Sequence, residues 1–332
     1  GRPVRVQWMR HDEHGYEPKG PGMVMRVHGA LDAGNRVAAW DYAVWTPTHA
    51  RRPANRAGNL LAGEETGAPE TVTRPIGGER NAQHGYAFPA DRVVVHQLDR
   101  SALRVSALRG LAAPQNTFAN ESFVDELAAA AGADPVQFRL RHLADPRGAA
   151  VIQAAARAAG WQPRPSPRPE ARSGGRAAGR GIAYCQYENE HAYVATVVEV
   201  EVDRASGAIR VRRVVVGHDC GLVINPDGVR NQIEGNVLQA ISRTLKEAVA
   251  FDGAGVTSLD WVSYPILTFT EVPDAVDIVL VDAGDKAPVG AGEPATCPVP
   301  AAIANAVFDA TGARLRTVPF TPARVREELA RA

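Results

Sequence analysis

Apolar residues in the first third of the chain alternate with polar ones, which is the spacing of β-strands. Runs at 23–32 and 36–46 have strand character, and the Ala-Gly-Asn turn between them predicts a hairpin. A further strand is expected at 92–98. The intervening segment, 47–90, is rich in Pro, Gly, Asn and Arg, so we expect a long loop of the kind that often has a functional role.

Helical spacing then replaces the alternation. We expect helices at about 117–131, 135–143 and 147–159. The Asp134-Pro135 pair fits the start of the second helix, because an aspartate side chain caps helix starts and proline is tolerated in the first turn.

Both spacings recur in the second half. The runs 192–203 and 208–217 flank a short turn and predict a second hairpin. A helix is expected at 228–249, where apolar residues recur every three or four positions. A strand at 276–282 and a helix at 299–311, ending at a glycine, complete the pattern.

Length and composition predict two folding units. A chain of 332 residues exceeds the size at which one core usually keeps growing. Residues 162–180 are rich in Pro, Gly, Ser and Arg and predict a linker. We therefore expect an α+β fold with two subdomains, 1–161 and 181–332, each of mixed sheets with packed helices.

Charge and cysteine content narrow the classes of partner. Lys plus Arg and Asp plus Glu both number 37, which disfavours nucleic acid and favours a small molecule or a protein. No apolar run approaches the length of about 20 residues that spans a bilayer, so no membrane span is expected. The three cysteines lack CxxC spacing, so we expect reduced thiols rather than a metal site. The sequence does not indicate a compartment.

One segment has the features of a catalytic loop. In Gly290-Ala291-Gly292-Glu293-Pro294, the two glycines let the backbone approach a ligand, and the proline holds Glu293 extended. The helix that follows would favour the ionised carboxylate, which is the form a general base needs. A turn with a solvated glutamate explains the same residues.

Two further segments could bind an anion or a cofactor. Residues 106–115 contain the single Arg109 among small residues just before a helix, although a plain loop would look the same. The predicted helix at 228–249 has Gln232 and a central Gly235, whose cost of about 1 kcal/mol relative to alanine could be offset by close packing. A cysteine nucleophile at 218–220 is disfavoured, because adjacent residues of a strand point in alternating directions.

Taken in order, three segments resemble the molybdenum hydroxylase family of xanthine dehydrogenase and aldehyde oxidase. They are ALRGLAAPQNTFANESF, HDCGLVINPDGVRNQIEG and GAGEPATCPVPAAIANAVFDATGARLR. The likeness is greatest to the large subunit of the isoquinoline 1-oxidoreductase type, including the ending VPFTPARV, and it covers nearly the whole chain.

The resemblance implies a set of roles. Glu293 would be the catalytic base in hydroxylation of an N-heteroaromatic compound or an aldehyde, with water as the oxygen source. The implied cofactor is the molybdenum–molybdopterin cytosine dinucleotide, and electrons would pass to [2Fe-2S] clusters on a small partner subunit. No residue is expected to ligate metal directly. The implied cofactor-binding residues are Leu108, Arg109, Gly110, Gln232, Gly290, Ala291 and Gly292.

The chain also departs from the family pattern. The family's large subunit has GGGFG and MGQG segments that contact the cofactor, and neither occurs here. The resemblance therefore implies that this chain corresponds to the C-terminal half of the molybdenum subunit, with an N-terminal half as partner. The alternative is a non-catalytic remnant or assembly half that binds partner subunits without cofactor.

Overall fold

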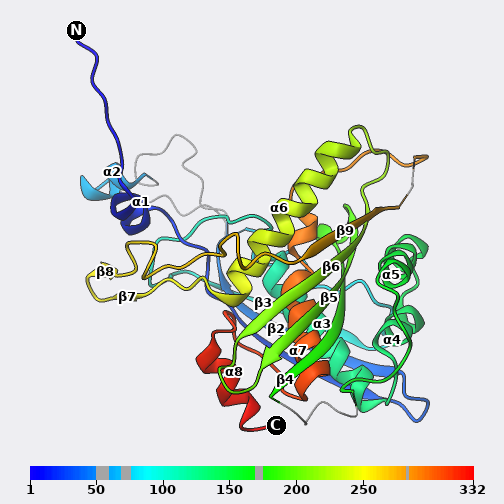
Figure 1. The fold of residues 1–332 in the computed structure, drawn as a ribbon. Coiled ribbons are helices and arrows are strands. Elements are labelled where there is room, and N and C mark those ends of the chain that lie inside the picture. Colours follow the sequence, from blue (N-terminus) through cyan, green and yellow to red (C-terminus); the bar gives the residue numbers. More distant parts are fainter. Residues whose placement is uncertain (50–59, 69–75, 169–174, 282–283) are drawn as a thin grey trace.

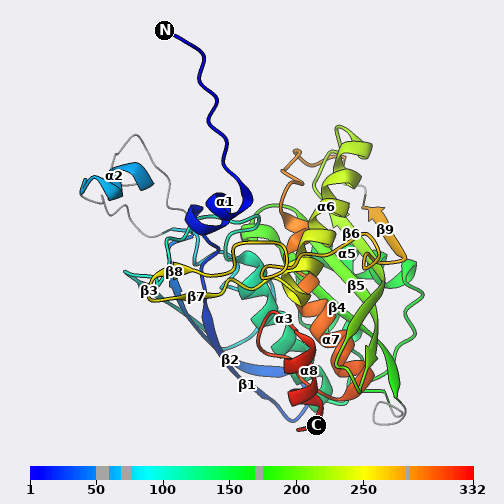
Figure 2. The same ribbon diagram turned by 60° about the vertical axis from the view of Figure 1, so that its left-hand side comes forward.

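In its described residues, the computed structural model has two larger sheets and one two-stranded sheet, with helices packed between and around the larger two (Figure 1). The α+β prediction is therefore confirmed. Helices α3 and α7 lie side by side between the sheets, as a second view also shows (Figure 2). The structure describes residues 1–49, 60–68, 76–168, 175–281 and 284–332.

The first sheet has the order β1-β2-β3. Strands β1 (Val24–Leu31) and β2 (Val37–Pro47) form the predicted antiparallel hairpin, and β3 (Asp91–Leu98) pairs with β2 in parallel. Trp40 and Tyr42 on β2 are buried, because the central strand turns its side chains into the core.

Three helices follow this sheet, as predicted. They are α3 (Ala113–Ala130), α4 (Pro135–His142) and α5 (Pro146–Ala158). The Asp134 side chain accepts hydrogen bonds from two backbone N–H groups in the first turn of α4, so the predicted cap is present.

The second sheet has the order β4-β5-β6-β9. Its strands are β4 (Arg176–Gln186), β5 (Tyr193–Asp203), β6 (Ile209–Asp219) and β9 (Ala275–Leu280). The predicted hairpin is the antiparallel pair β5–β6, and β9 lies parallel to β6.

Helices cover both faces of this sheet. Helix α7 (Val299–Thr311) packs on β4 and β5, and α5 packs on β5 and β6. Glycines permit the contacts: a Cβ on Gly181 would lie 2.3 Å from a carbonyl oxygen of α7, and one on Gly217 would lie 2.4 Å from a carbonyl oxygen of α5. The β5 residues that pair with Gly181 and Gly217 are an odd number of positions apart. Because successive residues of a strand face opposite sides of the sheet, α7 and α5 lie on opposite faces.

The remaining elements flank this core. Helix α6 (Pro226–Leu245) buries Ile233, Val237 and Ile241 of the predicted apolar stripe. Among the described residues, none of the helices combines the length and the apolar character that crossing a membrane requires. The short elements are α1 (Arg10–Tyr16), α2 (Leu61–Glu65), η2 (Tyr187–Asn189), β7 (Phe251–Asp252), β8 (Gly255–Val256), η3 (Pro294–Thr296) and α8 (Pro322–Leu329).

The predicted linker is wrong at its C-terminal end. Residues 176–180 begin strand β4, and Arg164 and Ser166 donate hydrogen bonds to the buried Asp309 of α7. The small residues that suggested a linker instead allow the α7 backbone to approach β4. Residues 169–174 lie outside the described part, and the division into two subdomains remains a prediction.

A buried ion pair connects the elements of both halves. Glu121 of α3 accepts hydrogen bonds from Arg139 Nε at 2.8 Å, Tyr86 Oη at 2.6 Å and the Tyr184 backbone N at 2.9 Å. Neither charged side chain is more than 2% exposed. Asn305 of α7 donates to the Glu121 carbonyl oxygen at 3.3 Å. One carboxylate thus links α3, α4, β4 and the loop before β3.

We expect Arg139→Met to lower the free energy of unfolding by about 3 to 5 kcal/mol, because it leaves the Glu121 carboxylate buried without its cation. Urea unfolding measures the loss. The matched control is Arg316→Met, which removes the exposed partner of Glu126 and should cost less than about 1 kcal/mol. Equal losses in the two variants would contradict the argument.

Candidate functional site

Three segments that are far apart in the sequence meet through Arg109. Its guanidinium donates from Nε to the Gly292 carbonyl oxygen at 2.6 Å and from Nη2 to Gln232 Oε1 at 2.6 Å. Nη1 donates to Gln239 Oε1 at 3.1 Å. The planar, five-donor guanidinium can serve all three acceptors at once, so it fixes the loop 106–112 against α6 and the 290–293 loop.

The Glu293 carboxylate lies in the same cluster. Its Oε1 accepts from the backbone N of Gly110 at 3.2 Å, and its Oε2 accepts from the Tyr187 hydroxyl at 2.6 Å. Glu293 is half-buried. An ionised carboxylate offers about four acceptor positions, so acceptor positions remain for further donors.

The backbone of the Arg109 loop is set by a left-handed turn. Gly110 has φ of 92° and Leu111 has φ of 50°. A Cβ on Gly110 would lie 2.8 Å from Pro114 Cγ, so both conformation and space require glycine. This turn aims the Gly110 N–H at Glu293 and places Ala113 at the start of α3.

Gly235 in the middle of α6 has the close neighbour that the sequence suggested. A Cβ at this position would lie 3.3 Å from Arg109 Nη1. The missing side chain lets the guanidinium lie against the helix and reach Gln232. The helical cost of this glycine is therefore offset by a polar contact at the site.

The predicted cofactor-binding residues divide into two groups. Arg109, Gly110, Gln232 and Gly292 are joined to one another or to Glu293 by hydrogen bonds. The other three lie beside them: Leu108 and Gly290 are exposed, and Ala291 is half-buried. A Cβ on Gly290 would meet no atom within 4 Å, so open space lies beside this loop.

Sequence reasoning missed Tyr187. This residue is only 5% exposed and lies in η2, between β4 and β5, about a hundred residues from the Glu293 loop. Burial raises the pKa of its phenol well above the ordinary value, and the hydrogen bond to Glu293 adds to the shift. The hydroxyl therefore remains a donor. The non-glycine left-handed backbone at Glu188 and Asn189 was not readable from sequence.

A cavity of about 680 Å³ opens beside the Arg109 loop. Arg109 forms part of the cavity wall. Burial lowers the pKa of its guanidinium, whereas the nearby charge of Glu293 raises it. The cavity lies between the start of β1, one face of α3 and the end of α6. Its walls include Met23, Met25, Phe118, Phe123 and Arg243. Its size is that of a small-molecule site.

In the segment 218–220, neither ring nitrogen of His218 has a hydrogen-bond partner among the described residues, so His218 does not activate a nucleophile there. Asp219 forms two hydrogen bonds with Arg147, at 2.7 and 2.8 Å, so it is not available to orient His218. Burial lowers the pKa of His218 to about 4. Burial also raises the pKa of the Cys220 thiol. A thiol with a raised pKa is a poor nucleophile, so these observations agree with the expectation that Cys220 is not a nucleophile.

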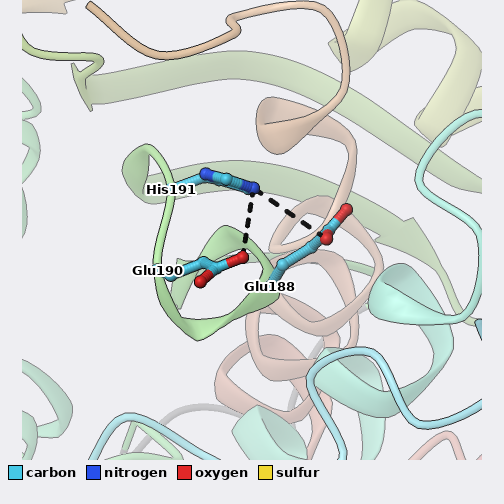
Figure 3. A group of neighbouring side chains, drawn as sticks. All are labelled: Glu188, Glu190 and His191. Atoms are coloured by element: carbon cyan, nitrogen blue, oxygen red, sulfur yellow. Dashed lines mark ion pairs between the residues drawn. The ribbon is translucent and has the colours of Figure 1, made fainter. Parts of the chain in front are cut away.

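A small acidic cluster lies next to Tyr187. Glu188, Glu190 and His191 have side-chain atoms within 4.8 Å of one another (Figure 3). Glu188 is also paired with Arg80. The arrangement is an ion-pair network at the surface end of the turn, and nothing further at this position indicates a cation.

The chain is similar to known proteins over nearly all of its length. Two family models, each described as a molybdopterin cofactor-binding domain, match residues 1–143 and 119–273. A subunit of the nicotinate dehydrogenase of Pseudomonas putida is 43% identical over 99% of the chain, and the beta subunit of the isoquinoline 1-oxidoreductase of Brevundimonas diminuta is 33% identical over 97%. The chain spans 28% and 39% of the length of these two relatives.

Solved structures show the same fold. Quinoline 2-oxidoreductase of Pseudomonas putida matches with a TM-score of 0.77 at 16% identity, over 97% of this chain and 64% of its own. The aldehyde oxidoreductase of Desulfovibrio gigas matches with a TM-score of 0.73 at 17% identity, over 98% of this chain and 51% of its own.

We expect Gly110→Ala to destabilise the protein more than Gly132→Ala. Both glycines have positive φ, so each alanine should cost about 1 to 2 kcal/mol from backbone strain. Only at Gly110 does the new methyl group also collide with Pro114. Thermal unfolding of the two variants measures the difference, and equal melting temperatures would show that the turn adapts freely.

Proposed function

Because the chain belongs to the molybdopterin cofactor-binding family, we propose that it forms the part of a molybdenum hydroxylase site that supplies the catalytic base. The observation that supports this most directly is the convergence of Arg109, Gly110, Gln232 and Glu293 from three separate segments. Each belongs to a segment that the family resemblance singles out.

The residues present fit a molybdenum cofactor at this position. The glycines of the 290–292 loop leave open space, since a Cβ on Gly290 would meet nothing and one on Gly292 would be 4.0 Å from Gln232. Gln232 is exposed, so its amide can face a ligand. Amide, guanidinium and backbone N–H groups are the donors that a pterin and its phosphates need.

Within this site, Glu293 has the role of general base. When bound, the molybdenum cofactor supplies the two-electron redox chemistry, with water as the source of oxygen. The Glu293 carboxylate is held by two neutral donors and has free acceptor positions, so it can take a proton from a reacting group in front of it. Gln232 and the glycine loop would hold the cofactor, and Arg109 would fix the loop that presents the Gly110 N–H.

The substrate class that the proposal favours is an N-heteroaromatic compound. The names of three similar proteins, a nicotinate dehydrogenase, an isoquinoline oxidoreductase and a quinoline oxidoreductase, all specify nitrogen heterocycles. The apolar cavity beside Arg109 is compatible with flat aromatic molecules. An aldehyde is the second substrate class, because aldehyde oxidoreductases share the fold.

The proposal extends to the cofactor form and to partners. We propose the cytosine dinucleotide form of the cofactor, a small subunit with [2Fe-2S] clusters that receives the electrons, and polypeptide corresponding to the N-terminal half of the molybdenum subunit. The absence of GGGFG and MGQG sequences from this chain supports the last partner. Analysis of copurifying chains and of released nucleotide tests all three.

We expect Glu293→Gln to lower turnover by at least about a thousandfold while the molybdenum content stays unchanged, because the amide removes the base and little volume. Oxidation of nicotinate, isoquinoline and quinoline by the enzyme purified with its partners measures this.

The matched control for this variant is Glu234→Gln, the same change at an exposed position of α6. It should retain wild-type turnover. Near-normal turnover of Glu293→Gln would remove the base assignment, whatever the result for Glu234.

We also expect Gly290→Val to reduce bound molybdenum about tenfold or more without lowering the melting temperature. The added side chain enters open space in the protein alone, but it occupies the space proposed for the cofactor. Gly253→Val is the control, since a Cβ there also meets nothing within 4 Å and lies in the β7–β8 turn. Full molybdenum occupancy in Gly290→Val would place the cofactor elsewhere.

A further inference from the structure

We propose that Tyr187 is a positioning residue for Glu293: its hydroxyl, directed by Arg80, holds the carboxylate in the orientation in which it takes a proton. This inference rests on the proposed role of Glu293 as base. It assigns a function to two residues outside the three segments that resemble the family.

The direct contact is short and nearly enclosed. Tyr187 Oη donates to Glu293 Oε2 at 2.6 Å, a length typical of a hydroxyl bonded to an ionised carboxylate. Tyr187 packs in a small core with Ala113, Cys185 and Cys297, so the ring cannot swing away. Ala113 begins α3 and Cys297 follows the Glu293 loop, which means that the phenol is wedged between the two segments that meet at the site.

Arg80 determines where the phenolic proton points. Arg80 Nη1 donates to Tyr187 Oη at 3.4 Å, so the phenol oxygen accepts from one side and must donate on the other. The acceptor on that other side is Glu293. Arg80 is held in turn by its ion pair with Glu188. Glu188 also lies within ion-pair distance of His191 (Figure 3).

The turn that follows Tyr187 has a strained backbone, and hydrogen bonds from a neighbouring segment hold it in place. Glu188 has φ of 56° and Asn189 has φ of 61°, conformations that side-chain-bearing residues rarely adopt. Asn81 holds the turn from both sides: its Oδ1 accepts from the Glu188 N at 2.9 Å and its Nδ2 donates to the Gln186 carbonyl at 2.7 Å. Strain that the surroundings over-determine is typical of functional turns.

The segment that contains Arg80 is itself fixed to α3. Asn116 donates to the Arg80 carbonyl oxygen at 2.8 Å, and Asn120 donates to the Asn81 carbonyl oxygen at 3.0 Å. The route from the core to the carboxylate therefore runs from α3 through residues 80–81 and Tyr187 to Glu293. Hydrogen bonds connect each of these segments to the next.

The test compares Tyr187→Phe with Tyr193→Phe. Both remove one hydroxyl that donates to a carboxylate, since Tyr193 donates to Asp145 at 2.8 Å away from the site. We expect Tyr187→Phe to keep its molybdenum and its KM but to lose about 10- to 100-fold in kcat for the heterocycle that the wild-type enzyme oxidises best. Tyr193→Phe should keep wild-type kcat.

The pH profile distinguishes positioning from a general structural effect. A donor to Glu293 favours the ionised carboxylate, so its removal should move the acid limb of the kcat profile to higher pH. Other charged or titratable groups near Glu293 include Arg80, Arg109, Glu188 and Cys297, and Tyr187→Phe and Tyr193→Phe both retain them. An unchanged acid limb together with unchanged kcat in Tyr187→Phe overturns the proposal.

A structural readout does not depend on turnover. In a crystal structure of Tyr187→Phe, the Glu293 carboxylate should leave hydrogen-bond distance of the Gly110 N–H or occupy more than one orientation. A single carboxylate orientation, unchanged from wild type, contradicts the inference even if no substrate is found.

A second variant covers the case in which Tyr187→Phe folds poorly. Arg80→Gln removes the donor to the phenol, and we expect a loss of about 3- to 10-fold in kcat. The loss should vanish in the Tyr187→Phe background, because Arg80 acts through the hydroxyl. If the kcat losses of Arg80→Gln and Tyr187→Phe are fully additive, Arg80 does not act through the Tyr187 hydroxyl. If Glu293→Gln itself retains turnover, the proposed function fails first, and the Tyr187 results are then judged on the crystal structure alone.

Discussion

The packing of both halves of the chain depends on the groups that donate hydrogen bonds to one buried carboxylate, that of Glu121. Glu121 on α3 is nearly inaccessible to water, and an unpaired charge there would be far too costly for a fold of ordinary stability. Arg139 neutralises it, while Tyr86 and the Tyr184 N–H occupy remaining acceptor positions. Because these donors come from different elements, satisfying the charge also fixes α3 against α4 and β4.

The site inherits its geometry from this packing. Helix α3 begins just after the Gly110 turn, and α7 begins just after the Glu293 loop. The two helices lie side by side and are joined by Asn305, which donates to the Glu121 carbonyl oxygen. The N-terminal ends of both helices therefore reach the same place. The loops that precede the two helices are therefore close enough for Arg109 to join them by a hydrogen bond to the Gly292 carbonyl oxygen.

Periodicity predicted most of the strands and helices, because amphipathic elements repeat their burial at a fixed spacing. The sequence prediction failed where a glycine-rich composition fits both a linker and a closely packed strand. Gly179 belonged to the segment predicted as a linker, but the missing side chain leaves space in which the α7 backbone packs. Motif likeness found Arg109, Gln232 and Glu293. It could not find Tyr187, because a turn with left-handed Glu188 has no local signature and its partner lies far along the chain.

Two carboxylates of the protein differ in the groups that donate to them. Glu121 faces the Arg139 guanidinium at hydrogen-bond distance, so a full positive charge compensates this buried carboxylate. Glu293 has a guanidinium nearby, but Arg109 is turned toward the Gly292 carbonyl and Gln232 instead. The donors to Glu293 are a backbone N–H and a phenol, both neutral. Neutral donors orient the Glu293 carboxylate without placing a full countercharge at hydrogen-bond distance, which is the arrangement that the proposed base role needs.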